Sequence, residues 1–242
     1  MRAFITSILL FATVSIASAQ PATNATTVVD QVQKFYANIK QVTAMFRQEV
    51  TNNTFGSTKQ SDGTLWIEKP GKMRWDYLDK KPTTSTVVVK KSFISDGSQL
   101  WVVDHENKQV LKKSLQQDML PVAVTFLYGK GNLSADFNPA IDTSSSYGAK
   151  GDIVLKLTPK QPSAQYKALY LVLNPTDYHV KESVIVDSSS NVNHFHFYSP
   201  DFDKPMKDSW FQFDPASVKS YRVVDADQQQ QASGSGAPAT NK

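Results

Sequence analysis

The sequence predicts a mainly β domain built on an antiparallel sheet. Strand-like segments follow one another at short intervals, separated by turn residues such as Pro70-Gly71 and Asp96-Gly97. Such meandering is typical of antiparallel pairing and not of parallel βαβ units. The 242 residues include no cysteine, so a hydrophobic core and not disulfides must stabilise the fold.

The segment 63–77, GTLWIEKPGKMRWDY, is apolar on both faces of its two predicted strands. Leu65 and Ile67 alternate with Trp66, which points the opposite way. The segment 95–103, SDGSQLWVV, has the same property. Since an antiparallel sheet with one wet face alternates apolar and polar residues, both faces here must be covered, either by protein or by a ligand.

The N-terminus has the pattern of a cleavable signal peptide over residues 1–19. Arg2 precedes an uncharged run, and Ala17-Ser18-Ala19 forms a small-x-small cleavage site. We therefore expect an exported, periplasmic protein that begins at Gln20. A domain would occupy residues 20–224, and the polar tail 225–242, rich in glutamine, serine and glycine, would be disordered.

Two helices are predicted from apolar spacing. The first begins at a cap on Thr26 or Thr27 and extends to about Val42, where the period changes to that of a strand. The second spans 118–128, with Pro121 in its first turn, and is apolar nearly all round. Such a helix is either buried in a core or lies against an apolar cavity.

Turns are expected at 62–63, 70–71, 79–82, 96–97 and 105–107, with a connecting loop at 142–151. The later strands are expected at 153–157, 168–173, 180–186, 193–198 and 210–213. Long apolar side chains alternate along them, which indicates one strongly hydrophobic face.

Catalytic motifs are missing from the sequence. It contains no Gly-x-Ser-x-Gly and no glycine-rich phosphate loop. His194 and His196 would share a strand face, with His179 nearby, but polar residues on the outer face of a sheet explain this pattern without a metal. We therefore expect a binding protein and not an enzyme, with no cofactor and no metal. The net charge of +4 includes no dense basic run, so nucleic acid is not an expected partner.

A set of short motifs, in order along the chain, resembles the LolA family of periplasmic lipoprotein carriers. The motifs are Phe46-Arg47-Gln48, Gly63-Thr64-Leu65-Trp66-Ile67, Lys69-Pro70-Gly71, Arg74-Trp75, Ser95-Asp96-Gly97, Leu100-Trp101, LKLTP at 155–159 and FQFDP at 211–215. The resemblance implies an unclosed antiparallel β-barrel, a half-barrel whose hydrophobic cavity is covered by short helices that form a lid.

The resemblance and the apolar alternation together suggest site residues. The expected acyl-chain cavity is lined by Phe46, Leu65, Ile67, Met73, Trp75, Leu100, Leu155, Leu171, Phe195 and Phe213. The lid residues would be Met119, Leu120, Val124 and Leu127. Lys69 occupies the position of a family arginine that contacts the lid, so the resemblance implies a latch there, without the planar fork of arginine.

The implied function is to bind the acyl chains of lipoproteins released from the inner membrane and to shuttle them to the outer membrane. The implied partners are lipidated lipoproteins, an inner-membrane ABC transporter that loads the carrier, and an outer-membrane receptor lipoprotein or the outer membrane itself. We expect a monomer. The alternative is a half-barrel module that senses lipids or lipoproteins and regulates an envelope response.

Overall fold

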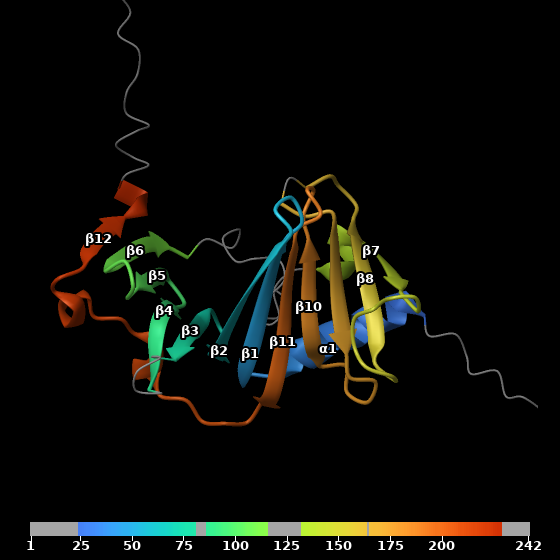
Figure 1. Cartoon of the computed structure of the whole chain (residues 1–242). Coiled ribbons are helices and arrows are strands. Elements are labelled where there is room, and N and C mark those ends of the chain that lie inside the picture. The colour runs from blue at the N-terminus through green and yellow to red at the C-terminus, as the bar shows by residue number, and fades with distance from the viewer. Residues whose placement is uncertain (1–23, 81–85, 116–131, 164, 229–242) are drawn as a thin grey trace, which may run out of the picture.

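A computed structural model describes residues 24–80, 86–115, 132–163 and 165–228. They form one open, 12-stranded sheet that does not close into a barrel, in the order β12-β6-β5-β4-β3-β2-β1-β11-β10-β9-β8-β7. All neighbouring strands are antiparallel except β12 and β6. The predicted half-barrel is therefore confirmed. Figure 1 shows helix α1 lying across one face of the strands from β8 to β11.

The strands are β1 (Gln41–Asn52), β2 (Ser57–Glu68), β3 (Lys72–Lys80), β4 (Val87–Asp96), β5 (Gln99–Asp104), β6 (Gln109–Ser114), β7 (Phe137–Ile141), β8 (Ile153–Pro159), β9 (Ala168–Leu173), β10 (Val180–Val186), β11 (Val192–Asp201) and β12 (Arg222–Asp225). The described helices are α1 (Ala25–Asn38), α3 (Leu133–Asp136) and two short 3-10 helices, η3 (Asp208–Phe211) and η4 (Pro215–Val218). In the described part of the chain, no helix is long and apolar enough to cross a membrane.

Helix α1 begins two or three residues earlier than the sequence predicts. Its N-cap is Asn24, whose side-chain oxygen accepts hydrogen bonds from the backbone N–H groups of Thr26 and Thr27. The prediction of Thr26 or Thr27 as the cap is therefore wrong, because the backbone N–H groups of both threonines donate to the Asn24 side chain. Its inner face buries Val28, Val29, Val32 and Tyr36.

The predicted turn at 62–63 is also wrong, because β2 continues through it. A Cβ on Gly63 would lie 2.3 Å from the Phe46 ring and 2.4 Å from the Asp76 carbonyl oxygen. The glycine thus makes room for an aromatic ring from the neighbouring strand β1.

The predicted turns at Pro70-Gly71 and 96–97 are confirmed. Gly71 and Gly97 both have positive φ, of 75° and 100°. A Cβ on Gly71 would lie 2.9 Å from the Cα of Gly97, so the two hairpin turns are in close contact.

The predicted strand at 210–213 is wrong. Residues 208–211 form the 3-10 helix η3, and the chain from there to residue 221 covers the outer face of β2 to β6. Trp210 packs against Trp66 at 6.1 Å between ring centroids, and Phe213 against Trp101 at 5.4 Å. This C-terminal segment covers the second apolar face, for which the sequence predicted the helix at 118–128 or acyl chains as the cover.

A partly buried ion pair connects this segment to the sheet. Asp76, 5% exposed, accepts hydrogen bonds from Arg74 Nε at 2.8 Å and from Ser92 Oγ at 2.6 Å. Arg74 also donates to the carbonyl oxygen of Trp210. Because the carboxylate is paired twice, its burial is compensated, and the guanidinium connects the sheet to η3.

The ordered chain extends beyond the predicted end of the domain at residue 224. Asp225 belongs to β12, and the Asp227 carboxylate accepts hydrogen bonds from the backbone and hydroxyl of Ser114. The predicted tail at 225–242 therefore starts too early. Its remainder from 229, the predicted signal peptide 1–19 and the predicted helix 118–128 lie outside the described residues.

Candidate binding site

The inner face of the curved sheet carries the main hydrophobic core. All residues predicted to line a cavity belong to this one buried cluster, except Phe213. The prediction that Phe213 lines the cavity is wrong, because Phe213 packs on the outer face against Trp101. The aromatic alternation at 210–213 has the pattern of a strand, which is why the sequence placed Phe213 on the inner face. Whether the remaining residues line an acyl-chain cavity stays a prediction.

Aromatic rings form the centre of the inner face. The Phe46 ring lies 5.1 Å from Trp75, 5.0 Å from Tyr77 and 6.0 Å from Phe195, measured between centroids. Burial raises the pKa of Tyr77 to about 12, so its hydroxyl is neutral at physiological pH. The centre of the inner face is therefore apolar and uncharged at physiological pH.

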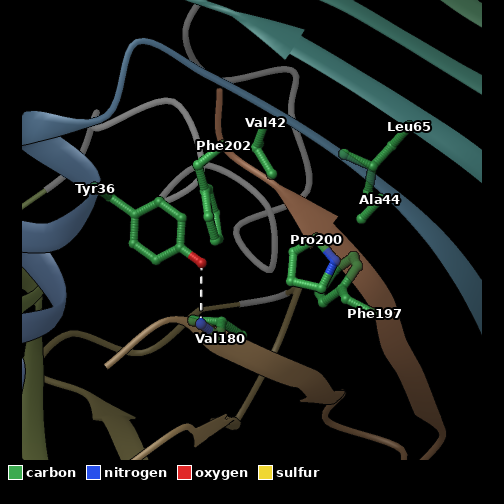
Figure 2. A pocket seen from close by; sticks show the side chains of 8 residues that line it. All are labelled: Tyr36, Val42, Ala44, Leu65, Val180, Phe197, Pro200 and Phe202. Carbon is green, nitrogen blue, oxygen red and sulfur yellow. Dashed lines mark hydrogen bonds between the residues drawn. The ribbon is translucent and has the colours of Figure 1, made fainter. Parts of the chain in front are cut away.

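Helix α1 is attached to the sheet and to α3 by a small number of polar contacts. The Tyr36 hydroxyl accepts a hydrogen bond from the backbone N–H of Val180 in β10 at 3.0 Å, as Figure 2 shows. Gln33 Oε1 accepts one from the N–H of Leu133 at the start of α3 at 2.7 Å. Burial raises the pKa of Tyr36, which keeps the hydroxyl protonated.

Lys69, the predicted latch, contacts the same helix. Its ammonium group donates a hydrogen bond to the carbonyl oxygen of Tyr36 in the last turns of α1, and its backbone N–H donates to the Lys40 carbonyl at 2.9 Å. A cation near a helix C-terminus is favourable, because the last carbonyls carry partial negative charge. Burial lowers the pKa of Lys69. A latch to residues 118–128 stays a prediction, because the lid residues Met119, Leu120, Val124 and Leu127 lie outside the described residues.

A small apolar pocket lies between α1 and the sheet. Its volume is about 10 Å³, room for about one water molecule. Figure 2 shows its lining, which consists of Tyr36, Val42, Ala44, Leu65, Val180, Phe197, Pro200 and Phe202.

The sequence pattern identified Leu65 in this pocket and missed its other lining residues. Phe197 had a usable signal, since it alternates with Phe195. Phe202 follows a proline in a loop rich in aspartate, and only the tertiary structure brings it back against Phe35 of α1.

An open antiparallel sheet with an apolar inner face, crossed by a helix, defines a half-barrel binding domain. The family model described as "Outer membrane lipoprotein carrier protein LolA" matches residues 37–214, which is most of the chain. The chain belongs to the LolA family.

Several relatives are similar over most of the chain. An outer-membrane lipoprotein carrier protein from Dechloromonas aromatica is 26% identical over 187 residues, covering 77% of this chain and 83% of the relative. A carrier of the same name from Nitrosomonas europaea is 25% identical, covering 78% and 82%.

Solved structures are more distant. A LolA superfamily protein from Nitrosomonas europaea has a TM-score of 0.39 and 11% identity, covering 79% of this chain and 99% of that one. The MucA/MucB complex of Pseudomonas aeruginosa includes a chain with a TM-score of 0.46 and 16% identity, covering 83% of this chain and 63% of that one.

Proposed function

We propose that this protein binds the acyl chains of lipoproteins between α1 and the inner face of the sheet, and carries them from the inner to the outer membrane. The observation that supports this most directly is the continuous apolar surface around Phe46, Trp75 and Phe195. Family membership and the names of the relatives agree with it. The proposed role is that of a carrier and not of an enzyme.

The energetics of acyl transfer explain the need for such a carrier. Exposing an acyl chain to water costs about 0.8 kcal/mol per CH₂, so a chain of ~16 carbons would cost on the order of 12 kcal/mol. Free diffusion through an aqueous compartment is therefore excluded in practice. A predominantly apolar inner surface binds chains of different shape and releases them without breaking many hydrogen bonds.

Loading requires movement at the pocket beneath α1. A volume of about 10 Å³ holds no acyl chain. The hydrogen bonds from Val180 to Tyr36 and from Lys69 to Tyr36 connect α1 to the sheet and to the turn after β2. We propose that α1 separates from Phe202 and Val180 when cargo enters, and that residues 118–128 contribute to the lid.

The same proposal includes the cellular setting. Residues 1–19 would direct export and be removed, and the carrier domain would act as a monomer in the periplasm. Lipidated lipoproteins would be delivered by an inner-membrane ABC transporter and accepted by an outer-membrane receptor lipoprotein or by the membrane.

Release of lipoproteins from spheroplasts tests the function. Purified protein, added to the medium around the spheroplasts, should bring a lipidated lipoprotein into the soluble fraction. It should have no effect on a variant of that lipoprotein that cannot be lipidated because its cysteine is replaced. Equal behaviour of the two forms would contradict an acyl-chain carrier.

A matched pair of variants locates the site. Phe202→Glu places a charge in the pocket wall at a partly exposed position, and should reduce release strongly. Phe55→Glu makes the same change at a position that is 80% exposed in the β1–β2 turn, and should leave release intact. Equal activity of the two variants would place the acyl site elsewhere.

A further inference from the structure

The outer face of the central strands carries a cluster of imidazoles and carboxylates that acyl binding does not use. In the sheet register, Glu49 of β1 lies opposite His194 of β11, and His196 lies between Arg47 and Glu182 of β10. The intervening Phe195 is 4% exposed and belongs to the inner core. Alternation therefore places both histidines on the face opposite the acyl site.

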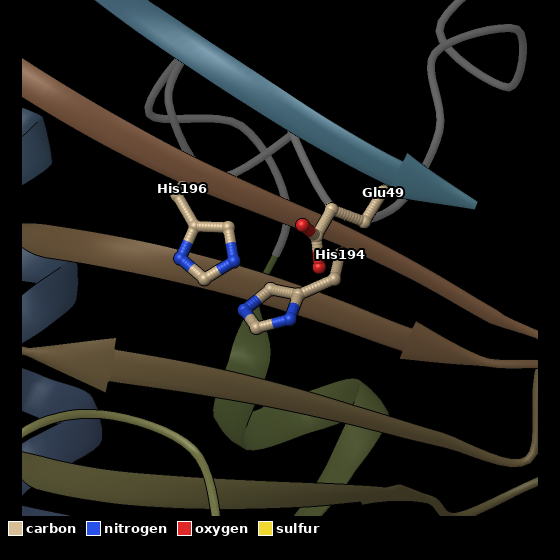
Figure 3. A group of neighbouring side chains, drawn as sticks. All are labelled: Glu49, His194 and His196. Carbon is tan, nitrogen blue, oxygen red and sulfur yellow. The ribbon is translucent and has the colours of Figure 1, made fainter. Parts of the chain in front are cut away.

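Three side chains in this cluster have the spacing of a metal site. Ligand atoms of Glu49, His194 and His196 lie within 4.8 Å of one another, and Figure 3 shows the carboxylate beside the two rings. In a tetrahedral zinc site with bonds of about 2.0–2.2 Å, ligand atoms lie about 3.4 Å apart. Small rotations of these side chains would close the remaining difference.

The groups around the three side chains are those that orient metal ligands. Glu182 Oε2 is hydrogen-bonded to His194 Nε2 at 2.9 Å, and its Oε1 lies 3.6 Å from His196 Nδ1, which is too far for a hydrogen bond. A carboxylate that accepts from one ring nitrogen leaves the other nitrogen with its lone pair. Gln60 Nε2 donates to Glu49 Oε1 at 2.6 Å, which fixes the third ligand in the same way.

The local charges favour a cation. Arg47, the nearby cation, forms two hydrogen bonds with Asp62 and is neutralised by it. The two imidazole centroids are only 3.8 Å apart, an arrangement that two charged rings would resist.

We propose that Glu49, His194 and His196 bind one divalent transition-metal ion, with zinc as the best match, and that Glu182 positions the His194 ring. Two imidazoles and a carboxylate suit zinc, while calcium and magnesium prefer oxygen ligands alone. His179, which the sequence suggested as a third ligand, instead pairs with Asp177 at 2.7 Å. The site would connect β1 to β11 by a bond outside the backbone ladder.

Calorimetric titration of the tag-free, metal-stripped chain with zinc chloride tests this site. The wild type should bind zinc at close to one ion per chain, and saturating zinc should raise the melting temperature. His196→Gln and Glu49→Gln should each weaken binding about tenfold or more. His179→Gln removes a histidine outside the cluster and should bind zinc like the wild type.

Two results would overturn the proposal. One is the absence of saturable binding to the wild type. The other is unchanged affinity in both His196→Gln and Glu49→Gln, with circular dichroism confirming that the variants are folded, since zinc would then bind elsewhere. Acyl-chain transfer does not enter these measurements, so their outcome is independent of the carrier function.

Discussion

The Tyr36 hydroxyl and the Val180 N–H join two segments that are 144 residues apart, through a buried hydrogen bond of 3.0 Å. Val180 is 3% exposed, so its N–H has no access to bulk water as a substitute partner. One phenol therefore fixes how closely α1 lies to the first residue of β10.

Tyr36→Phe should lower the free energy of unfolding by about 1–3 kcal/mol, because it leaves the Val180 N–H buried without this acceptor. Urea unfolding measures the loss. Hydrogen exchange should show faster exchange at the Val180 amide. Tyr198→Phe removes a hydroxyl at a position that is 46% exposed and should change neither quantity. Unchanged exchange at Val180 in Tyr36→Phe would contradict the role of this bond.

The pH dependence of stability should reveal Lys69. Burial lowers its pKa in the folded protein below the ordinary value of 10.5, so the unfolded chain binds more protons in the window between the two values. The wild type should therefore gain stability relative to Lys69→Arg as the pH rises through that window. Arginine stays protonated throughout and serves as the reference. Urea unfolding of both proteins from neutral pH upward measures the difference, and a constant or falling difference would disprove the assignment.

Gly63→Ala should destabilise the protein by about 1–3 kcal/mol or more, because the new methyl group would overlap the Phe46 ring and the Asp76 carbonyl oxygen. Ser61→Ala, in the same strand, should cost much less. In the double variant Gly63→Ala with Phe46→Leu, part of the strain is relieved, so the combined loss should be smaller than the sum of the two. Strict additivity would show that the ring does not determine the choice of glycine.

Phe213→Ala should show that the outer core contributes to stability but not to acyl-chain binding. Phe213 is partly buried against Trp101, so its loss should cost about 2 kcal/mol, less than the ~3–5 kcal/mol of a fully buried phenylalanine. Lipoprotein release per folded molecule should remain at the wild-type level. Phe195→Ala, on the inner face, should reduce both stability and release. Reduced release in Phe213→Ala would restore the original cavity assignment.

Local alternation predicted the regular strands well. The predicted spans 168–173 and 180–186 agree with β9 and β10 residue for residue. Both strands combine β-branched and long aliphatic side chains with turn residues at their ends, so the information lies within the segment. The turn at Pro70-Gly71 was recognisable for the same reason.

The errors occurred where a residue serves a partner that is distant in the sequence. Asp62-Gly63 is a typical turn sequence, but Gly63 lies within a strand and makes space for Phe46. Trp210 and Phe213 alternate like strand residues, yet they cover the sheet from outside. Strand β7 was missed because it contains Pro139, which is tolerated there because β7 is the last strand of the sheet.

The candidate sites divide in the same way. The inner apolar face was predictable, because its members alternate along each strand. The Glu49 contribution to the histidine cluster was not, because it depends on the pairing of β1 with β11. The Arg74–Asp76–Ser92 network likewise needs the register of β3 and β4 before its charges can be paired.

The position of β1 between β2 and β11 sets the order in which the sheet can be completed when the chain folds from its N-terminus. When the chain emerges with its N-terminus first, β1 can pair with β2 as soon as β2 follows. The other edge of β1 has no partner until residues 192–201 appear. A nascent chain that stops before β11 presents a long unpaired strand, which is a template for pairing with another chain. Fragments truncated before residue 192 should therefore self-associate, and the complete chain closes that edge only when nearly all of its sheet is made.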